Sequence, residues 1–177
     1  RQMCIRDRDT AMIDLRKTTT ATEAEYRKFY LSANETAKAL GVTTEEIISQ
    51  TAEWSRLGYS MQEAAKLAEN SAIFRAVSPE MDIQMATDGL VSIIKAFDID
   101  VDDSMDGIIS KVNAVGNAFA VSNADVVEAL TRSSAAMAVA NNTFDETVAL
   151  ATAAIEITRD ASSCLLYTSD AADELDG

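Results

Sequence analysis

The 177-residue chain contains no histidine, one proline and few aromatic residues, which make up 6% of it. Without histidine, Ser-His-Asp and Cys-His nucleophile systems, His-ligated metals and His proton shuttles are excluded. The apolar content, 47% of the chain, is therefore carried mainly by Ala, Leu, Ile, Val and Met. Because most of these side chains suit helices and proline breaks them, the composition predicts a helical protein.

Basic residues are scarce relative to acidic ones. Lys and Arg total 15 against 29 Asp and Glu, which gives a net charge of -14. A chain this acidic repels nucleic-acid phosphates and anionic lipids, so we expect no sequence-independent binding to either. No uninterrupted apolar run approaches the roughly 18 residues that a membrane-spanning helix needs. We therefore expect no transmembrane segment here.

Both cysteines, Cys4 and Cys164, lie in terminal segments that resemble translated DNA adapter. Residues 1–8 and 164–171 can be back-translated into complementary DNA strands, and the shared string resembles a transposase-type sequencing-library adapter. We expect residues 1–8 to be an adapter-derived artefact. Residues 164–177 are expected to be the same, or else a disordered tail; the alternative is a real N-terminal arm and acidic tail. Such segments are excluded from reasoning about the fold.

The remaining residues, 9–163, are then expected to be an internal fragment of a longer, metagenomically sequenced chain. This stretch has no cysteine and a net charge of -12. Disulfides and thiolate chemistry are accordingly not expected in it, and its cellular compartment cannot be inferred from cysteine content.

Repeated helix-start signals dominate residues 9–163. At four places a hydroxyl residue precedes an acid by three positions, the spacing of a capped helix N-terminus. Ser78 followed by Pro79 predicts a further start, and Gly41 and Gly58 suit left-handed helix ends. The four hydroxyl–acid pairs are Thr43 and Glu46, Ser60 and Glu63, Ser122 and Asp125, and Thr143 and Glu146.

These signals predict an all-α fold of about seven short helices, packed as antiparallel hairpins or a bundle. Apolar residues recur at helical spacing within the segments. We expect the alanine-rich stretch 135–138 to let helix backbones approach closely, and Met81, Met85 and Met137 to fill the core. The expected helices are 22–40, 44–57, 61–76, 79–97, 104–120, 123–140 and 144–159.

The densest acidic cluster, residues 98–103, suggests calcium, which prefers several carboxylate oxygens. A calcium loop starting at Asp102 places Asn113 at the twelfth position, where a bidentate Glu belongs. One starting at Asp98 places Asp103 where glycine is needed and ends on Ile109. We favour a solvated linker whose acids cap a helix beginning at Ser104, and predict no metal site.

Other candidate residues have structural explanations. Glu45 and Glu46 could act in acid–base chemistry, but they lie at a predicted helix start. Trp54 and Tyr59 could form a binding platform, and we favour aromatic anchors at a hairpin corner. The sequence has no phosphate loop, metal-ligand spacing or nucleophile elbow. It therefore predicts no catalytic, cofactor-binding or metal-binding residue, and a protein that is not an enzyme.

The order of motifs resembles the core region of phage tail tape measure proteins. The resemblance covers residues 40–157 and depends on the succession of motifs, because each one alone is ordinary helix capping. In that family a short helix ends in an aromatic, a basic residue and glycine, and a capped helix with Glu-Ala follows. The matching runs are residues 40–46, 54–60, 63–64, 112–117, 121–122, 126–130 and 142–146.

The resemblance implies a structural component of the phage tail with no cofactor. Tape measure proteins set tail length, since tail tube subunits polymerise around them, and they leave the tube during DNA ejection. Their implied partners are the tail tube protein and tail assembly chaperones, with self-association possible. The implied locations are the virion and, during assembly, the host bacterial cytoplasm. The alternative, a generic bacterial helical adaptor or signalling module, predicts long uninterrupted heptads.

Overall fold

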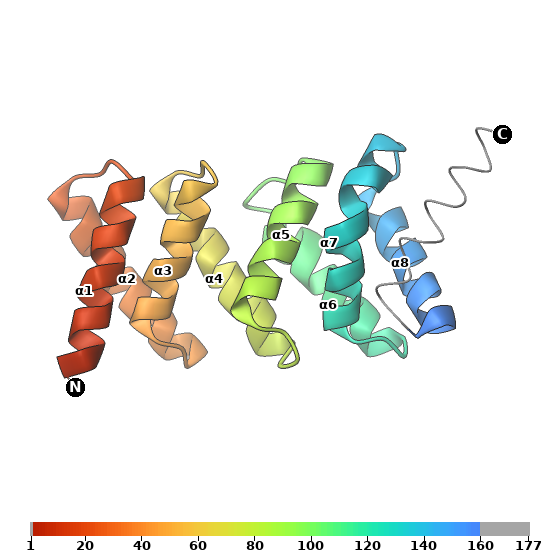
Figure 1. The fold of residues 1–177 in the computed structure, drawn as a ribbon, viewed down its shortest axis with the longest axis horizontal. Coiled ribbons are helices and arrows are strands. Elements are labelled where there is room, and N and C mark those ends of the chain that lie inside the picture. The colour runs from red at the N-terminus through yellow and green to blue at the C-terminus, as the bar shows by residue number, and fades with distance from the viewer. Residues whose placement is uncertain (1, 160–177) are drawn as a thin grey trace. The chain divides into compact units, whose positions relative to one another are not determined.

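The computed structural model describes residues 2–159, with side chains from Arg6 onward. The described residues form helices joined by short turns and contain no strand, which confirms the all-α prediction (Figure 1). Residues 164–177 and the side chain of Cys4 lie outside the described part. The helices are α1 (Gln2–Thr18), α2 (Glu23–Leu40), α3 (Thr44–Arg56), α4 (Met61–Val77), α5 (Ile83–Phe97), the π-helical segment η1 (Met105–Ile109), α6 (Ser110–Ala118), α7 (Asn123–Val139) and α8 (Phe144–Thr158).

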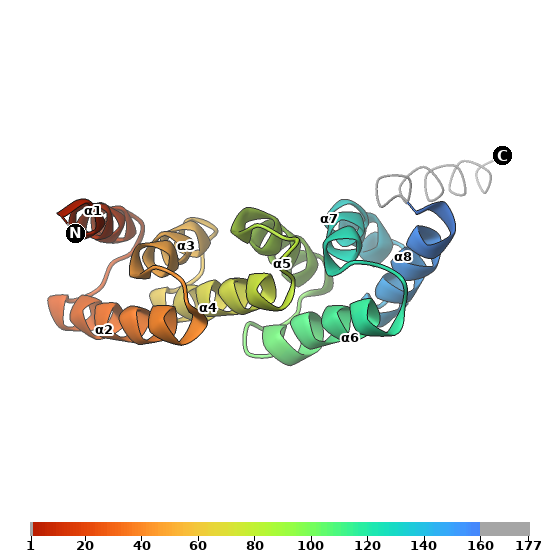
Figure 2. The same ribbon diagram turned by 90° about the horizontal axis from the view of Figure 1, so that it is seen from below.

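The chain divides into two compact units, unit 1 (Arg1–Ala76) and unit 2 (Val77–Gly177). In unit 1, α3 packs against both α1 and α2. In unit 2, α7 packs against α5, α6 and α8. Figure 2 shows the same scheme in each unit separately, with α1 beside α3 and α2 beneath them, and with α5 beside α7 and α6 beneath them. Helices α3, α5 and α7 begin at residues 44, 83 and 123, so successive helix pairs start about every 40 residues.

The core of unit 1 is built around aromatic side chains. Trp54 of α3 and Phe74 of α4 are fully buried, as is Leu15 of α1. The indole N–H of Trp54 donates a hydrogen bond to Ser71 Oγ at 3.3 Å. Burial of a tryptophan normally requires such a partner for its N–H, so Ser71 makes this packing possible.

The core of unit 2 is mainly aliphatic, although it also includes the buried Phe144. Leu90 and Ile93 of α5 are fully buried, and so are Val127 and Leu130 of α7. Gly89 lets α5 approach α7, because a Cβ at this position would lie 2.4 Å from Val127 Cγ1. The close helix approach of unit 2 therefore occurs at a glycine.

The four predicted hydroxyl caps are confirmed. Thr43 Oγ1 accepts from the Glu46 N–H at 3.1 Å, and Ser122 Oγ from the Asp125 N–H at 3.0 Å. The caps at Ser60 and Thr143 are reciprocal, since the acid three residues later also accepts from the cap residue's N–H. The structure adds a fifth cap of this kind, in which Thr22 and Glu25 form a capping box at the start of α2.

The start predicted at Pro79 is wrong. Met81 N–H donates to Ser78 O at 2.9 Å, which closes a turn around Pro79. Helix α5 begins later, where Asp82 is the N-cap and its Oδ1 accepts from the Met85 N–H at 2.7 Å. A carboxylate caps a helix as well as a hydroxyl does. Asp82, rather than Ser78 with Pro79, therefore sets the start of α5.

Two further differences concern helices. Helix α1 was not predicted, although it supplies the buried Ala11 and Leu15 to unit 1. The helix predicted over 104–120 instead starts as the π-helical segment η1 and continues as α6, which ends at Ala118. A wider π turn inside a helix is not signalled by the spacing of apolar residues.

The alanine-rich stretch 135–138 is buried only in part, since Met137 and Ala138 are half-buried. Ala135 and Ala136 are exposed, and Val139 at the end of α7 is 90% exposed. The expectation for methionines holds only in part. Met81 is buried, but in the turn before α5, while Met85 and Met137 are partly exposed.

Candidate functional site

An apolar groove runs between α6 and α8 in unit 2. Both helices pack against α7, which leaves the space between them open. The groove has a volume of about 450 Å³. Small side chains widen it, and Phe119 at the end of α6 is 50% exposed beside it. Its apolar lining consists of Ala114, Val115, Phe119, Val148, Ala149 and Ala153.

Charged groups flank this groove. Near its beginning, Lys111 of α6 forms an ion pair with Asp145 of α8. The Lys111 ammonium also lies 5.8 Å from the centre of the Phe144 ring. Beyond α8, the Arg159 guanidinium donates to Ala120 O at 3.0 Å. These contacts join the ends of the two helices and leave the apolar floor uncovered by the other described residues.

A buried polar junction connects α6, α7 and the segment before α5. Asn123 Nδ2 donates to Ser78 Oγ at 2.7 Å and to Asn113 Oδ1 at 3.2 Å. Asn123 is 7% exposed and Ser78 is fully buried. Asn123 Oδ1 has no hydrogen-bond partner and faces Gly116, where a Cβ would lie 2.0 Å away. A side chain at position 116 would therefore force Asn123 to move, so this arrangement favours glycine there.

Sequence reasoning missed both the groove and the junction. A glycine within a helical pattern, such as Gly116, often indicates close packing, and that signal could have pointed to the junction. The groove has no comparable signal, because Ala114, Ala149 and Ala153 are equally common on buried and solvated helix faces.

The acidic stretch 98–103 folds as a turn. Asp100 Oδ1 accepts from the Asp102 N–H at 2.9 Å, and Asp98 ends α5 with a left-handed φ of 51°. Ser104 makes no side-chain cap to the helix that follows, and its hydroxyl donates to Val101 O at 2.7 Å. The Asp100 carboxylate therefore stabilises the turn. The helix begins at Ser104 as predicted, and its capping by the acids of this stretch stays a prediction.

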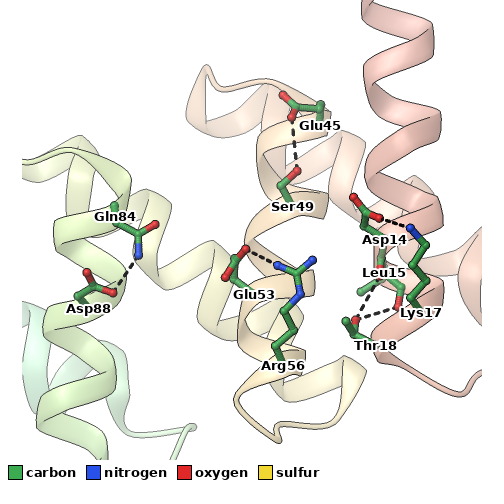
Figure 3. A network of polar contacts seen from close by, with 10 residues as sticks. All are labelled: Asp14, Leu15, Lys17, Thr18, Glu45, Ser49, Glu53, Arg56, Gln84 and Asp88. Carbon is green, nitrogen blue, oxygen red and sulfur yellow. Dashed lines mark hydrogen bonds and ion pairs between the residues drawn. The ribbon is translucent and has the colours of Figure 1, made fainter.

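Glu45 and Glu46 do not act as a pair in the structure. Ser49 Oγ donates to Glu45 Oε1 at 3.4 Å (Figure 3). Glu46 instead forms an ion pair with Arg75 of α4. The other polar contacts in Figure 3 also join residues three or four apart on one helix, as in the pairs Asp14–Lys17 and Glu53–Arg56. Local pairs of this kind are ordinary on solvated helix faces.

Trp54 and Tyr59 meet at the end of α3. Their ring centres are 5.5 Å apart with the planes at 72°, an edge-to-face contact. Because Trp54 is fully buried, it cannot serve as an open platform. This geometry agrees with the interpretation of the two rings as anchors at a hairpin corner.

The pKa shifts have local causes on exposed helix ends. Hydrogen bonds from Thr22 lower the pKa of Glu25, and those from Thr143 lower the pKa of Glu146. In α1 and α2, the paired side chains of Arg16 and Glu23 raise the pKa of the former and lower that of the latter. Each shift favours the charged form that the contact stabilises.

Two searches over the described residues give negative results. No helix there is both long and apolar enough to cross a bilayer. No three acid or cysteine side chains in residues 6–159 are grouped so that they could hold a metal ion.

Comparison with known proteins identifies a family. The phage-related minor tail protein family matches residues 32–172. No curated protein and no solved structure matches the chain. The match includes α3 to α8 entirely and half of α2, and with it the groove and the polar junction. The chain belongs to the phage-related minor tail protein family.

Proposed function

We propose that the chain is a fragment of a tail tape measure protein, which sets tail length during assembly and takes part in DNA ejection. The observation that carries the proposal is the family match over residues 32–172. It coincides with the motif order that resembles the tape measure core region over residues 40–157. The partners proposed with it are the tail tube protein and tail assembly chaperones, first in the host cytoplasm and then in the virion.

A helical chain suits the measurement of length. Each residue of a helix adds about 1.5 Å along the axis, so chain length converts directly into distance. The short capped helices form folded units here, and we propose that they extend or rearrange inside the tail tube. Cryo-electron microscopy density for a compact helical unit inside an assembled tube would contradict this rearrangement.

Deletion in the parent phage tests the proposal. Removing the 155 residues of 9–163 should shorten the tail by about 230 Å if they span it as helix, at about 1.5 Å per residue. Tail lengths would be measured by negative-stain electron microscopy. The matched control replaces the same residues with an unrelated helical sequence of equal length and should keep the tail length. Unchanged tails after the deletion would refute a measuring role.

A structural rather than catalytic role is part of the proposal. Several acids of the described residues form helix caps or surface ion pairs, among them Glu25, Glu146 and Glu128, and these contacts favour a structural role. The adaptor alternative predicted long uninterrupted heptads, but α2, which is the longest described helix, has 18 residues and ends at Gly41. Tail genes beside the coding sequence, with a much longer reading frame around it, would favour the tape measure; receptor domains would favour the adaptor.

The proposal for the chain ends remains that residues 1–8 and 164–177 derive from adapter DNA. The family match extends to residue 172 and so includes nine of the residues from 164 onward. The nucleotide sequence that encodes the two chain ends tests this proposal. Codons that spell the two complementary adapter strands would support the proposal, and any other codons would refute it.

A further inference from the structure

We propose that the groove between α6 and α8 binds an amphipathic α-helix of a partner protein, with apolar residues on one face and lysine or arginine on the other. This goes beyond the proposed measuring function, because it assigns a docking surface to unit 2. Helices that lay an apolar face into a groove are a recurrent mode of recognition.

The shape of the groove admits a helix face. Ala114 on one wall and Ala149 and Ala153 on the other leave about 450 Å³ between two helices. Phe119 offers a half-exposed ring, 50% accessible, at the end of α6. Larger side chains spaced three and four residues apart on an incoming helix would fill such a space as ridges fill grooves.

The walls of the groove are already held in place. Helices α6 and α8 both pack against α7, and the Lys111–Asp145 ion pair joins their beginnings. Arg159 links the end of α8 to Ala120 O. A groove that is formed before binding costs little ordering free energy when the partner arrives.

The charge of unit 2 identifies the chemistry of the partner. Residues 77–159 contain 13 acids and only 4 basic residues, a net charge of -9. Two of those basic side chains, Lys111 and Arg132, are paired with acids. Asp145 and Glu156 stand on the α8 wall of the groove, and Lys111, the partner of Asp145, stands on the α6 wall. An excess of acids around an apolar floor attracts and orients a cationic helix.

A designed peptide tests the proposal with the 177-residue chain. The probe is a helical peptide of about four turns, with leucines at spacings of three and four and lysines elsewhere. Two control peptides carry the same residues in shuffled order, or glutamate in place of lysine. Calorimetry should show saturable binding of the probe alone, weakened by added salt. Absence of probe binding, or equal binding of the shuffled peptide, would overturn the proposal.

Two matched variants locate the binding site. Ala153→Arg places a bulky cation in the groove and should weaken probe binding at least about tenfold. Leu150→Arg makes the same charge change on α8 at a 52% exposed position that does not line the groove. It should weaken binding less than about threefold. Equal losses would show that net charge alone holds the peptide, and would overturn the groove assignment.

A second pair of variants tests whether the negative charge of Glu156 contributes to binding. Sedimentation tests whether a second copy of the chain, rather than a partner helix, occupies the groove. Glu156→Gln should weaken binding of the probe peptide more than Glu80→Gln does. The latter removes an acid of the same unit that lies outside the groove. Circular dichroism spectra of all variants should match the parent. Concentration-dependent dimerisation that Ala153→Arg abolishes would assign the groove to a second copy of the chain and overturn the proposal.

Discussion

The two units use glycine in opposite ways. In unit 1, Gly41 and Gly58 follow helices with positive φ angles of 69° and 96°. In unit 2, Gly89 and Gly116 lie inside helices, where a Cβ would collide with Val127 or Asn123. The left-handed ends of unit 2 are occupied instead by Asp98, Asn141 and Arg159.

The two units also differ in the side chains of their cores and in their net charge. Unit 1 buries Trp54 and Phe74, and its acids and basic residues are equal in number, with 11 of each. The described residues of unit 2 bury aliphatic side chains around close helix contacts and carry a net charge of -9. One helical scheme is thus stabilised by large rings in one unit and by close approach in the other.

The largest expected effect is in the aromatic unit. Trp54→Ala should cost about 3–5 kcal/mol of unfolding free energy, because it leaves a cavity and removes the hydrogen bond to Ser71. Urea unfolding followed by far-ultraviolet circular dichroism measures this cost. Trp54→Phe keeps most of the packing and should cost less. If both substitutions cost the same, the ring volume is not what stabilises unit 1.

The second effect is in the close contact of unit 2. Gly89→Ala should destabilise by about 1–3 kcal/mol through overpacking against Val127, although alanine favours helices by about 1 kcal/mol. Adding Val127→Ala should recover part of the loss, as a double-mutant cycle would show. Gly107→Ala is the control, since its nearest atoms would lie 3.8 Å away. An unchanged unfolding free energy in Gly89→Ala would contradict the close approach of α5 to α7.

A smaller effect separates the helix ends of the two units. Gly41→Ala should cost about 1–2 kcal/mol, because a left-handed conformation is strained for a residue with a Cβ. Asp98→Gly should have the opposite sign, since it removes that strain from unit 2. Thermal unfolding of the two variants beside the parent measures both. Equal signs would show that side-chain contacts, rather than backbone conformation, decide these positions.

The smallest effect is on a capping box. Thr143→Ala should cost about 1 kcal/mol at neutral pH. Because Thr143 lowers the pKa of Glu146 below its ordinary value of 4.5, the cap stabilises the fold above that pH and weakens as pH falls through the lowered pKa. The difference in stability between variant and parent should therefore shrink from pH 6 to pH 3. A difference that stays constant would separate the cap from the charge of Glu146.

The sequence predicts the helices well where their ends carry local signals. The helix starts at Thr43, Ser122 and Thr143 can be predicted from the sequence, because a cap involves only residues within one helical turn. Pro79 gives a wrong helix start, because proline is common both in turns and at the first position of a helix. The N-cap residue Asp82 places the start of α5 a few residues later. The groove and the polar junction depend on how α6, α7 and α8 meet, which no local pattern contains. Gly116 is visible in the sequence, but its partner Asn123 becomes clear only in the fold.

The recurrence of helices α3, α5 and α7 about every 40 residues has an evolutionary consequence. Because side-chain caps satisfy backbone groups at the starts of α2, α3, α5, α7 and α8, adding or removing a pair of helices would leave few unpaired backbone groups at the junction. A gene built this way can change the extent of its product in discrete steps and still encode a chain that folds. Stepwise variation of that kind would serve any phage whose particle must change its dimensions.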